Sequence, residues 1–170
     1  MRLFRREPTT EPTTLQRGER VLARTTAEDG TVLAATRDAL HLGSVSADAP
    51  ARRIDWEQVE TADWDGETAT FQVTEVGRWG EERPVHNFVL DDARVFLELV
   101  HDRVTASIVI QRHVTVPNGS VRVIARRAPH GESRILWLYE YDEGVDPDDP
   151  RVQAAAEQAL ALAKADVGLV

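Results

Sequence analysis

Histidine is the side chain best suited to bind a metal or to transfer protons near neutral pH. The chain has five, and they lie far apart, at His41, His86, His101, His113 and His130. None has a partner at the i, i+4 spacing with which one helix face presents two ligands to zinc. Cysteine is absent, which removes thiolate ligands, disulfides and a thiol nucleophile together. We therefore expect neither a metal site nor a cofactor.

Carboxylates and hydroxyls are the remaining candidates for catalysis. Acidic residues occur in close pairs, Asp63 with Asp65 and Asp148 with Asp149, at positions typical of turns and helix caps. A glycosidase-type pair needs burial in a cleft, which nothing in the sequence indicates. The serines lie in no nucleophile-elbow context, and there is no glycine-rich phosphate loop. These patterns predict a protein that is not an enzyme.

The densest group of basic residues comprises Arg122, Arg126, Arg127 and Arg134. The two-residue period of a strand places Arg122 and Arg126 on the same side. Several acidic residues follow between 140 and 149. This arrangement favours cross-strand ion pairs over a phosphate site, with Arg122, Arg126 and Arg127 kept as candidate interaction residues.

Three tryptophans are candidates for binding rather than catalysis. Trp56 and Trp64 lie in strand-like segments, which favours packing over a role in a ligand groove. Trp79 lies in the polar loop between Gly77 and Pro84, where it either packs locally or is exposed. If exposed, Trp79 is the best single candidate for an anchor at a protein interface.

The composition limits the partners. A chain of 170 residues suits one domain, or one domain with an appendage. Its formal net charge of −9 opposes generic binding to nucleic acid or anionic lipid. No segment reaches the ~18–20 apolar residues of a membrane span. Residues 1–14 are predicted to be flexible because they are rich in Pro and Thr, and the basic, hydrophobic residues 1–6 either fray or tether the chain to a membrane or partner.

The sequence from Glu19 to Leu90 has the period of two that is typical of strands. The turn signals Asp29-Gly30 and Asp65-Gly66 interrupt it. We predict seven antiparallel strands here, within 21–25, 32–36, 39–42, 52–56, 59–64, 69–74 and 85–90.

Beyond Leu90 the period changes. Asp91-Asp92 is an N-cap signal, and apolar residues three and four apart predict one long helix to about Gln111. The sequence Pro-Asn-Gly-Ser at 117–120 ends this region. Two further strands, 121–127 and 134–141, and a final helix from about 148 to 165 complete the prediction.

The segment Thr36-Arg37-Asp38-Ala39-Leu40, followed by Ile54, Trp56 and Val59, resembles the T-x-x-x-L and I-x-W-x-x-[IV] strands of bacterial pleckstrin-homology-like (PH-like) and GRAM-like domains. The similarity covers roughly Leu15 to Val114. It implies an α+β fold: a PH-like seven-stranded antiparallel barrel or sandwich, capped by one long helix. The expected organisation is a PH-like domain over 15–116 and a C-terminal strand–strand–helix extension over 117–170 that packs on it.

The resemblance also implies a scaffold that binds rather than catalyses. In eukaryotic relatives a basic pocket near the first two strands holds phosphoinositide headgroups. The corresponding turn here, Thr26 to Gly30, contains Glu28 and Asp29, which repel phosphate. Phosphoinositide binding is therefore not expected.

Together these observations predict a cytoplasmic, non-catalytic binding or scaffolding domain that contacts a protein partner or a second copy of itself. The alternative is a small-ligand-binding protein or an enzyme that uses a pocket between the barrel and the helices.

Overall fold

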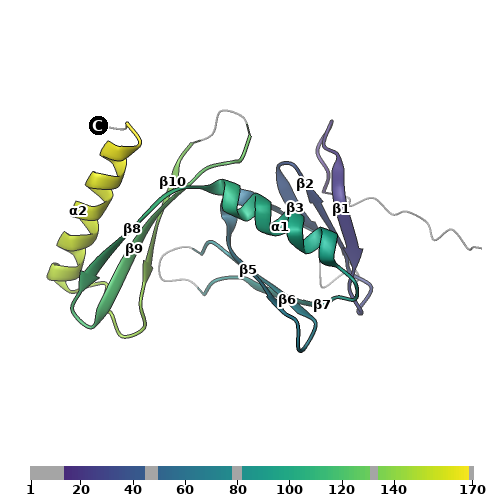
Figure 1. Ribbon diagram of the computed structural model, residues 1–170, viewed down its shortest axis with the longest axis horizontal. Coiled ribbons are helices and arrows are strands. Elements are labelled where there is room, and N and C mark those ends of the chain that lie inside the picture. The colour runs from purple at the N-terminus through teal and green to yellow at the C-terminus, as the bar shows by residue number, and fades with distance from the viewer. Residues whose placement is uncertain (1–13, 45–49, 78–81, 131–133, 169–170) are drawn as a thin grey trace, which may run out of the picture.

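The computed structural model describes residues 14–44, 50–77, 82–130 and 134–168 (Figure 1). Within these ranges, ten strands form three antiparallel sheets, and two α-helices accompany them. The predicted α+β class is confirmed. No helix in the described part of the chain is long and apolar enough to cross a bilayer.

The first seven strands form the two sheets of a sandwich. Sheet one has the order β1-β2-β3-β4 and sheet two the order β5-β6-β7. Their bounds are Val21–Thr26, Val32–Thr36, Ala39–Leu42 and Arg52–Asp55 for β1 to β4, and Val59–Asp65, Thr70–Glu75 and Val85–Val89 for β5 to β7. All seven predicted strands are present.

The two sheets do not close into a barrel. They meet at one corner, where Ala27 and Leu90 form an isolated antiparallel bridge and the Glu28 amide donates to the Val89 carbonyl over 3.0 Å. At the other crossover, one turn of 3-10 helix, Trp56–Gln58, separates β4 from β5. The turn separates two strands that belong to different sheets, and its Trp56 side chain is fully buried.

Alternation along the strands supplies the core of the sandwich. Leu33, Leu40 and Ile54 of sheet one face Phe71 of sheet two, and each is at most 2% exposed. Trp56 is fully buried, and its Nε1 donates to the Thr36 carbonyl over 3.2 Å. The prediction that Ile54 and Trp56 belong to the core is confirmed.

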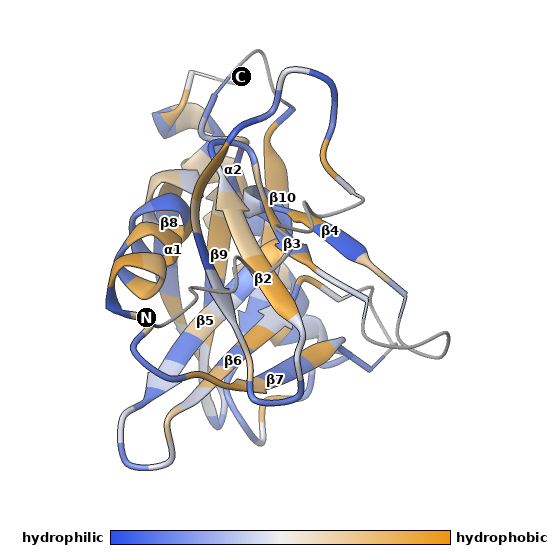
Figure 2. Cartoon of the chain, turned by 90° about the vertical axis from the view of Figure 1, so that its right-hand side faces the viewer, coloured by the Kyte–Doolittle hydropathy of each residue, from blue (hydrophilic) through white to orange (hydrophobic). Residues whose placement is uncertain are grey.

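Strand β2 is buried on both faces, as its apolar sequence predicts. Figure 2 shows β2 largely in hydrophobic colours and the edge strand β4 largely in hydrophilic ones. The outer face of β2 includes Ala34 and Thr36, which are both fully buried. The segment that precedes β1 covers this face through Glu19, which accepts a hydrogen bond from Thr36.

Helix α1 (Arg94–Ser107) caps the open side of the sandwich, with Phe96 and Val100 buried against the core. Phe96 meets Phe71 edge to face, with 5.7 Å between the ring centroids. The predicted Asp91-Asp92 cap is wrong. The N-cap is Ala93, without a side-chain hydrogen bond, because Asp92 adopts a φ of 44°.

The predicted extension of α1 to Gln111 is also wrong. The helix ends at Ser107, and Ile108 is already extended (φ −81°, ψ 121°). Strand β8 (Ile108–Val116) follows without a loop. The apolar residues at 104 and 108 fit the period of a helix as well as that of a strand. The β-branched run from Ile108 to Ile110 favours a strand.

The C-terminal sheet therefore has three strands, one more than predicted. Strand β9 (Gly119–Arg126) lies between β8 and β10 (Leu136–Tyr141). Asn118 (φ 67°) and Gly119 (φ 157°) make the sequence at 117–120 the tight turn of the β8–β9 hairpin. Hydrogen bonding thus groups residues from Ile108 onward with the C-terminal unit.

Helix α2 (Pro150–Asp166) packs on β8 and β9. It begins as predicted, since Asp149 is the N-cap and accepts from the Arg151 amide over 2.8 Å. Its buried stripe is Val152, Ala156, Ala159 and Ala163. Because three of these four side chains are methyl groups, the helix can approach the sheet closely. Figure 1 shows α2 at one end of the molecule and β1 at the other.

Replacing Phe71 with alanine should lower the free energy of unfolding by about 3–5 kcal/mol, because it empties the centre of the sandwich and removes the contact with Phe96. Denaturant unfolding measures the loss. Trp64→Ala on the neighbouring strand is the control, because Trp64 is 43% exposed and its loss should cost only about 1 kcal/mol. Equal losses would contradict the assignment of the core.

Candidate functional site

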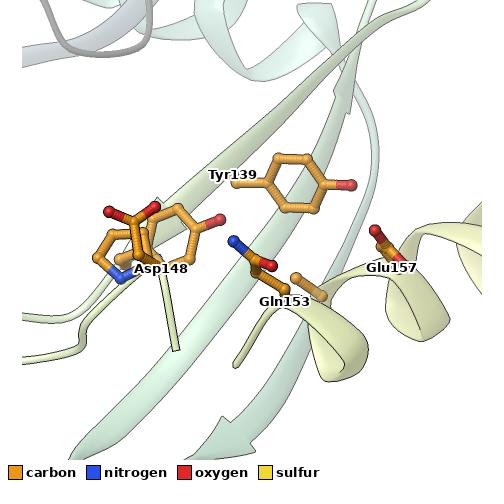
Figure 3. Close-up of a pocket in the computed structure, with 7 residues that line it drawn as sticks. Tyr139, Asp148, Gln153 and Glu157 are labelled. Atoms are coloured by element: carbon orange, nitrogen blue, oxygen red, sulfur yellow. The ribbon is translucent and has the colours of Figure 1, made fainter. Parts of the chain in front are cut away.

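One cavity lies between β10 and α2, because α2 covers β8 and β9 but not the outer strand of the sheet. Its volume is about 520 Å³. Figure 3 shows Asp148 and Glu157 at opposite ends of this groove, with Tyr139 and Gln153 between them. We name this cavity the tyrosine groove; its lining residues are Tyr139, Tyr141, Pro147, Asp148, Gln153, Ala156 and Glu157.

Two elements position these side chains. Tyr139 and Tyr141 are two residues apart on β10, so both face α2, with ring centroids 6.3 Å apart. Gln153 and Glu157 are four residues apart on α2 and share one helix face. The turn that caps α2 holds Asp148, whose amide donates to Asp146 Oδ1 over 3.0 Å. The buried methyl group of Ala156 leaves room for the rings.

The electrostatic field of the groove is negative. Burial raises the pKa of the Tyr139 hydroxyl, and the neighbouring Tyr141 and Glu157 raise it further. Burial likewise raises the pKa of Tyr141, with Asp148 adding to the effect. The described residues of the lining include two carboxylates and no basic side chain. Such a groove favours a cation, which the carboxylates attract and the faces of the tyrosine rings stabilise.

A hydroxyl–imidazole–carboxylate series occurs elsewhere, on the outer face of sheet one. Thr14 Oγ1 lies 2.7 Å from His41 Nδ1, and His41 Nε2 lies 3.1 Å from Glu19 Oε1. The order resembles that of a hydrolase triad. However, His41 is fully buried, and Glu19 also accepts from Thr36 Oγ1 over 2.5 Å. The series therefore fastens residues 14–19 across sheet one rather than facing a substrate.

A second cavity, of about 320 Å³, lies where the connections β1–β2 and β3–β4 approach β7. Arg52 and His86 line it, together with the apolar Leu42 and Phe88. Both polar groups already bind Glu75: Arg52 Nε lies 2.6 Å and His86 Nε2 2.7 Å from its Oε1. Asp29 completes the rim, so an anion would meet negative charge there.

A third cavity, of about 390 Å³, lies where β1 meets the first turn of α1. Arg94, which lines it, is 80% exposed at its side chain and pairs with Glu98. Val95 beside it is 64% exposed. None of the described residues that line this cavity contributes a buried polar group.

The two arginines of β9, Arg122 and Arg126, and Arg127 just after the strand have three different environments. Arg122 pairs with Glu140, directly opposite on β10, which confirms the predicted cross-strand ion pair. Arg126 is only 3% exposed: it donates to Ser107 Oγ over 2.9 Å and to the Glu60 carbonyl over 2.8 Å. Arg127 is exposed, and its backbone amide donates to the Ser107 carbonyl.

Arg126 joins the C-terminal unit to the sandwich. Ser107 ends α1, whereas Glu60 belongs to β5 of sheet two. Burial lowers the pKa of the Arg126 guanidinium, and Glu140 and Glu60 oppose that shift. The Glu60 carboxylate, 2.6 Å from Arg83, has a pKa raised by burial. Arg126 thus connects β9 of the C-terminal unit to α1 and to β5 of the sandwich.

The other predicted site residue, Trp79, lies outside the described residues. Of the carboxylate pairs, Asp65 and Asp149 occupy a turn and a cap as predicted. Among the described residues, no three histidine or acidic side chains converge as metal ligands do.

The sequence reasoning missed the tyrosine groove. Its only local signal was the pair Tyr139 and Tyr141 on one strand face. In the sequence, Glu157 lies beside the apolar stripe of α2, and Asp148 is predicted only as part of a turn or helix cap. What the sequence did not show is that α2 lies over β8 and β9, leaving the tyrosine face of β10 open.

Comparison with known proteins does not assign the chain to a family. The chain matches no model of a protein family, and none of the curated proteins is significantly similar to it in sequence.

Arg126→Ala should lower the free energy of unfolding by about 2–4 kcal/mol, because it leaves the Glu60 carbonyl and the Ser107 hydroxyl buried without their donor. The adjacent Arg127→Ala is the matched control and should change stability by no more than about 0.5 kcal/mol. Denaturant unfolding measures both effects. Similar losses for the two substitutions would contradict the structural role of Arg126.

Two buried glutamates should give opposite pH dependences. Burial alone would raise the pKa of Glu19, but hydrogen bonds from the Gln16 amide, Thr36 and His41 outweigh it and leave the pKa below its ordinary value of 4.5. Ionised Glu19 therefore stabilises the fold above pH 4.5, and this contribution is lost as the pH falls through the folded pKa. The pKa of Glu60 lies above 4.5, so its contribution decreases as the pH rises from 4.5 through the folded value.

Thermal unfolding of Glu19→Gln and Glu60→Gln from pH 2.5 to 8 measures both effects. The difference in stability between wild type and Glu19→Gln should grow in favour of wild type as the pH rises to about 5 and stay constant above it. The corresponding difference for Glu60→Gln should shift in favour of the variant. If the stability differences of the two variants changed with pH in the same direction, the environment described for one of the two glutamates would be wrong.

Proposed function

We propose that the protein is a non-catalytic binding module that holds a cationic segment of another polypeptide in the tyrosine groove. The observation that carries this proposal is the groove itself: Tyr139 lies between Asp148 and Glu157, Tyr141 also lines the groove, and none of its described lining residues is basic. A lysine or arginine side chain fits this chemistry, because it combines an apolar stem with a cation.

A PH-like architecture for the scaffold is part of the proposal. It is supported by the order of the elements, two antiparallel sheets of four and three strands followed by α1. It is also supported by the residues of the sequence pattern, since Leu40, Ile54, Trp56 and Val59 all lie in the core of the sandwich. A cytoplasmic location completes the proposal and is supported by the absence of cysteine.

A binding role fits the groove better than a catalytic one. Asp148 and Glu157 are exposed, whereas a carboxyl that acts as a general acid is held in apolar surroundings. The histidine best placed for proton transfer, His41, is enclosed with its partners already bound. The sandwich itself is filled by side chains such as Trp56 and Phe71, so its interior holds no ligand.

A second candidate function, small-ligand binding, is favoured by the cavity of about 320 Å³ at the rim of the sandwich, where the connections β1–β2 and β3–β4 approach β7. Leu42 and Phe88 would contact an apolar part of the ligand. Arg52 and His86 would contact a polar part only by giving up their bonds to Glu75. That exchange makes this site the weaker of the two.

Titration of the isotope-labelled chain with the peptide acetyl-Arg-Ala-Ala-Arg-amide should shift backbone amide resonances of residues 139–141 and 148–157. The shifts should saturate in the micromolar to millimolar range, and added salt should weaken binding because exposed charges are screened. Acetyl-Glu-Ala-Ala-Glu-amide should produce no shifts. The same spectra test the second candidate, because a ligand at the rim of the sandwich would instead shift residues 29–31, 42–43 and 86–88.

The matched variants replace two acids without changing the packing. Asp148→Asn with Glu157→Gln should abolish the shifts. Asp63→Asn with Glu67→Gln, an equal change of charge at exposed positions on another sheet, should leave them intact. Shifts spread over the whole acidic surface, or unaffected by the first pair, would contradict the proposed function.

A further inference from the structure

The chain itself contains a segment whose charges match those of the tyrosine groove. Residues 1–6, Met-Arg-Leu-Phe-Arg-Arg, contain three arginines and no acidic residue, a density matched only by residues 122–127. The latter belong largely to β9, where Arg122 pairs with Glu140 and Arg126 is buried. We name residues 1–6 the basic arm; it lies outside the described residues.

The order of side chains in the arm matches the order of groups along the groove. The groove has a carboxylate at each end and the Tyr139 ring between them (Figure 3). The arm has Arg2 at one end, Arg5 and Arg6 at the other, and Leu3 and Phe4 between them. Two ion pairs and an aromatic contact can therefore form at the same time, whereas a single charge would use only one end.

The groove of the same copy is out of reach for the arm. Thr14 lies against His41 in sheet one, and Figure 1 places β1 and α2 at opposite ends of the molecule. Residues 7–13, between arm and Thr14, span at most about 25 Å when fully extended. A compact chain of this length is roughly 40 Å across. The arm can enter the groove of a neighbouring molecule without crossing that distance.

We propose that the basic arm of one copy binds the tyrosine groove of a second copy, so that the protein associates with itself head to tail. This inference rests on the proposed function, because it names the partner of the same groove. The contact is heterologous, with different surfaces on the two molecules. Repetition therefore produces a ring if the rotation closes and an open chain if it does not.

The first test uses full-length variants in sedimentation velocity. Wild type should associate increasingly with concentration, and raising the salt should reverse the association. The arm variant, Arg2→Ser, Arg5→Ser and Arg6→Ser, should sediment as a monomer. The groove variant, Asp148→Asn and Glu157→Gln, should do the same. The control Asp63→Asn with Glu67→Gln should behave as wild type.

Mixing the two monomeric variants gives the decisive result. The arm variant keeps an intact groove and the groove variant keeps an intact arm, so an equimolar mixture should form one-to-one dimers and nothing larger. Wild type that stays monomeric at 100-fold the concentration used for the variants, or a mixture that stays monomeric, overturns the proposal. So does self-association that survives in both variants.

A peptide experiment separates failure of this inference from failure of the proposed function. A fluorescent peptide of residues 1–10 should bind the arm variant, and the groove substitutions added to that chain should weaken binding about tenfold or more. A peptide with Glu at positions 2, 5 and 6 should not bind. If acetyl-Arg-Ala-Ala-Arg-amide shifts the groove but the arm peptide does not bind, the groove serves another partner and this inference falls alone. If neither binds, both fall.

Anionic vesicles test the alternative partner of the arm, which is a membrane. Flotation of wild type with vesicles containing phosphatidylserine, lost in the arm variant and unchanged in the groove variant, would assign the arm to a membrane and overturn its docking on a second copy.

Discussion

The arrangement of this molecule depends on the guanidinium of Arg126. It is the buried cation at the junction of the sandwich with the C-terminal unit, and it donates to Ser107 at the end of α1 and to the carbonyl of Glu60 on β5. A charge removed from water costs several kcal/mol, and the hydrogen bonds of Nη1 and Nη2 offset part of that cost, whereas the buried Nε has no partner among the described residues. Arginine suits this position because its planar donors reach two acceptors in different elements at once.

The end of α1 lies at the same junction, at Ser107. The residues after Ser107 are β-branched, and the backbone becomes extended at Ile108. The Ser107 hydroxyl donates to the Val104 carbonyl within the last turn, while the Ser107 carbonyl accepts from the amide of Arg127. The helix therefore passes directly into β8, and the direction of the C-terminal sheet is set relative to the sandwich.

The tyrosine groove results from unequal packing on that sheet. Three buried alanines allow α2 to lie close to β8 and β9, where the facing residues Val114 and Val121 are small. Tyrosine rings at the same level of β10 would hold a helix away. The helix therefore stays on two strands, and the third keeps an open aromatic face bordered by carboxylates. The strand that α2 leaves uncovered is therefore the surface to which the proposed binding role is assigned.

Residue types and spacing determined the seven strands of the sandwich, the buried positions of Ile54 and Trp56, the cap of α2 and the ion pair of Arg122, because each depends on neighbours a few residues away or on an adjacent strand. They also determined the charge and aromatic content of the groove, although not its existence. Only the tertiary structure decided that the sandwich stays open, that Arg126 is buried while Arg127 is exposed, and that Tyr139 and Tyr141 line one groove with Asp148 and Glu157. These features depend on contacts between residues up to 66 positions apart, as between Glu60 and Arg126, and no local pattern encodes which of the chemically similar arginines or carboxylates will meet them.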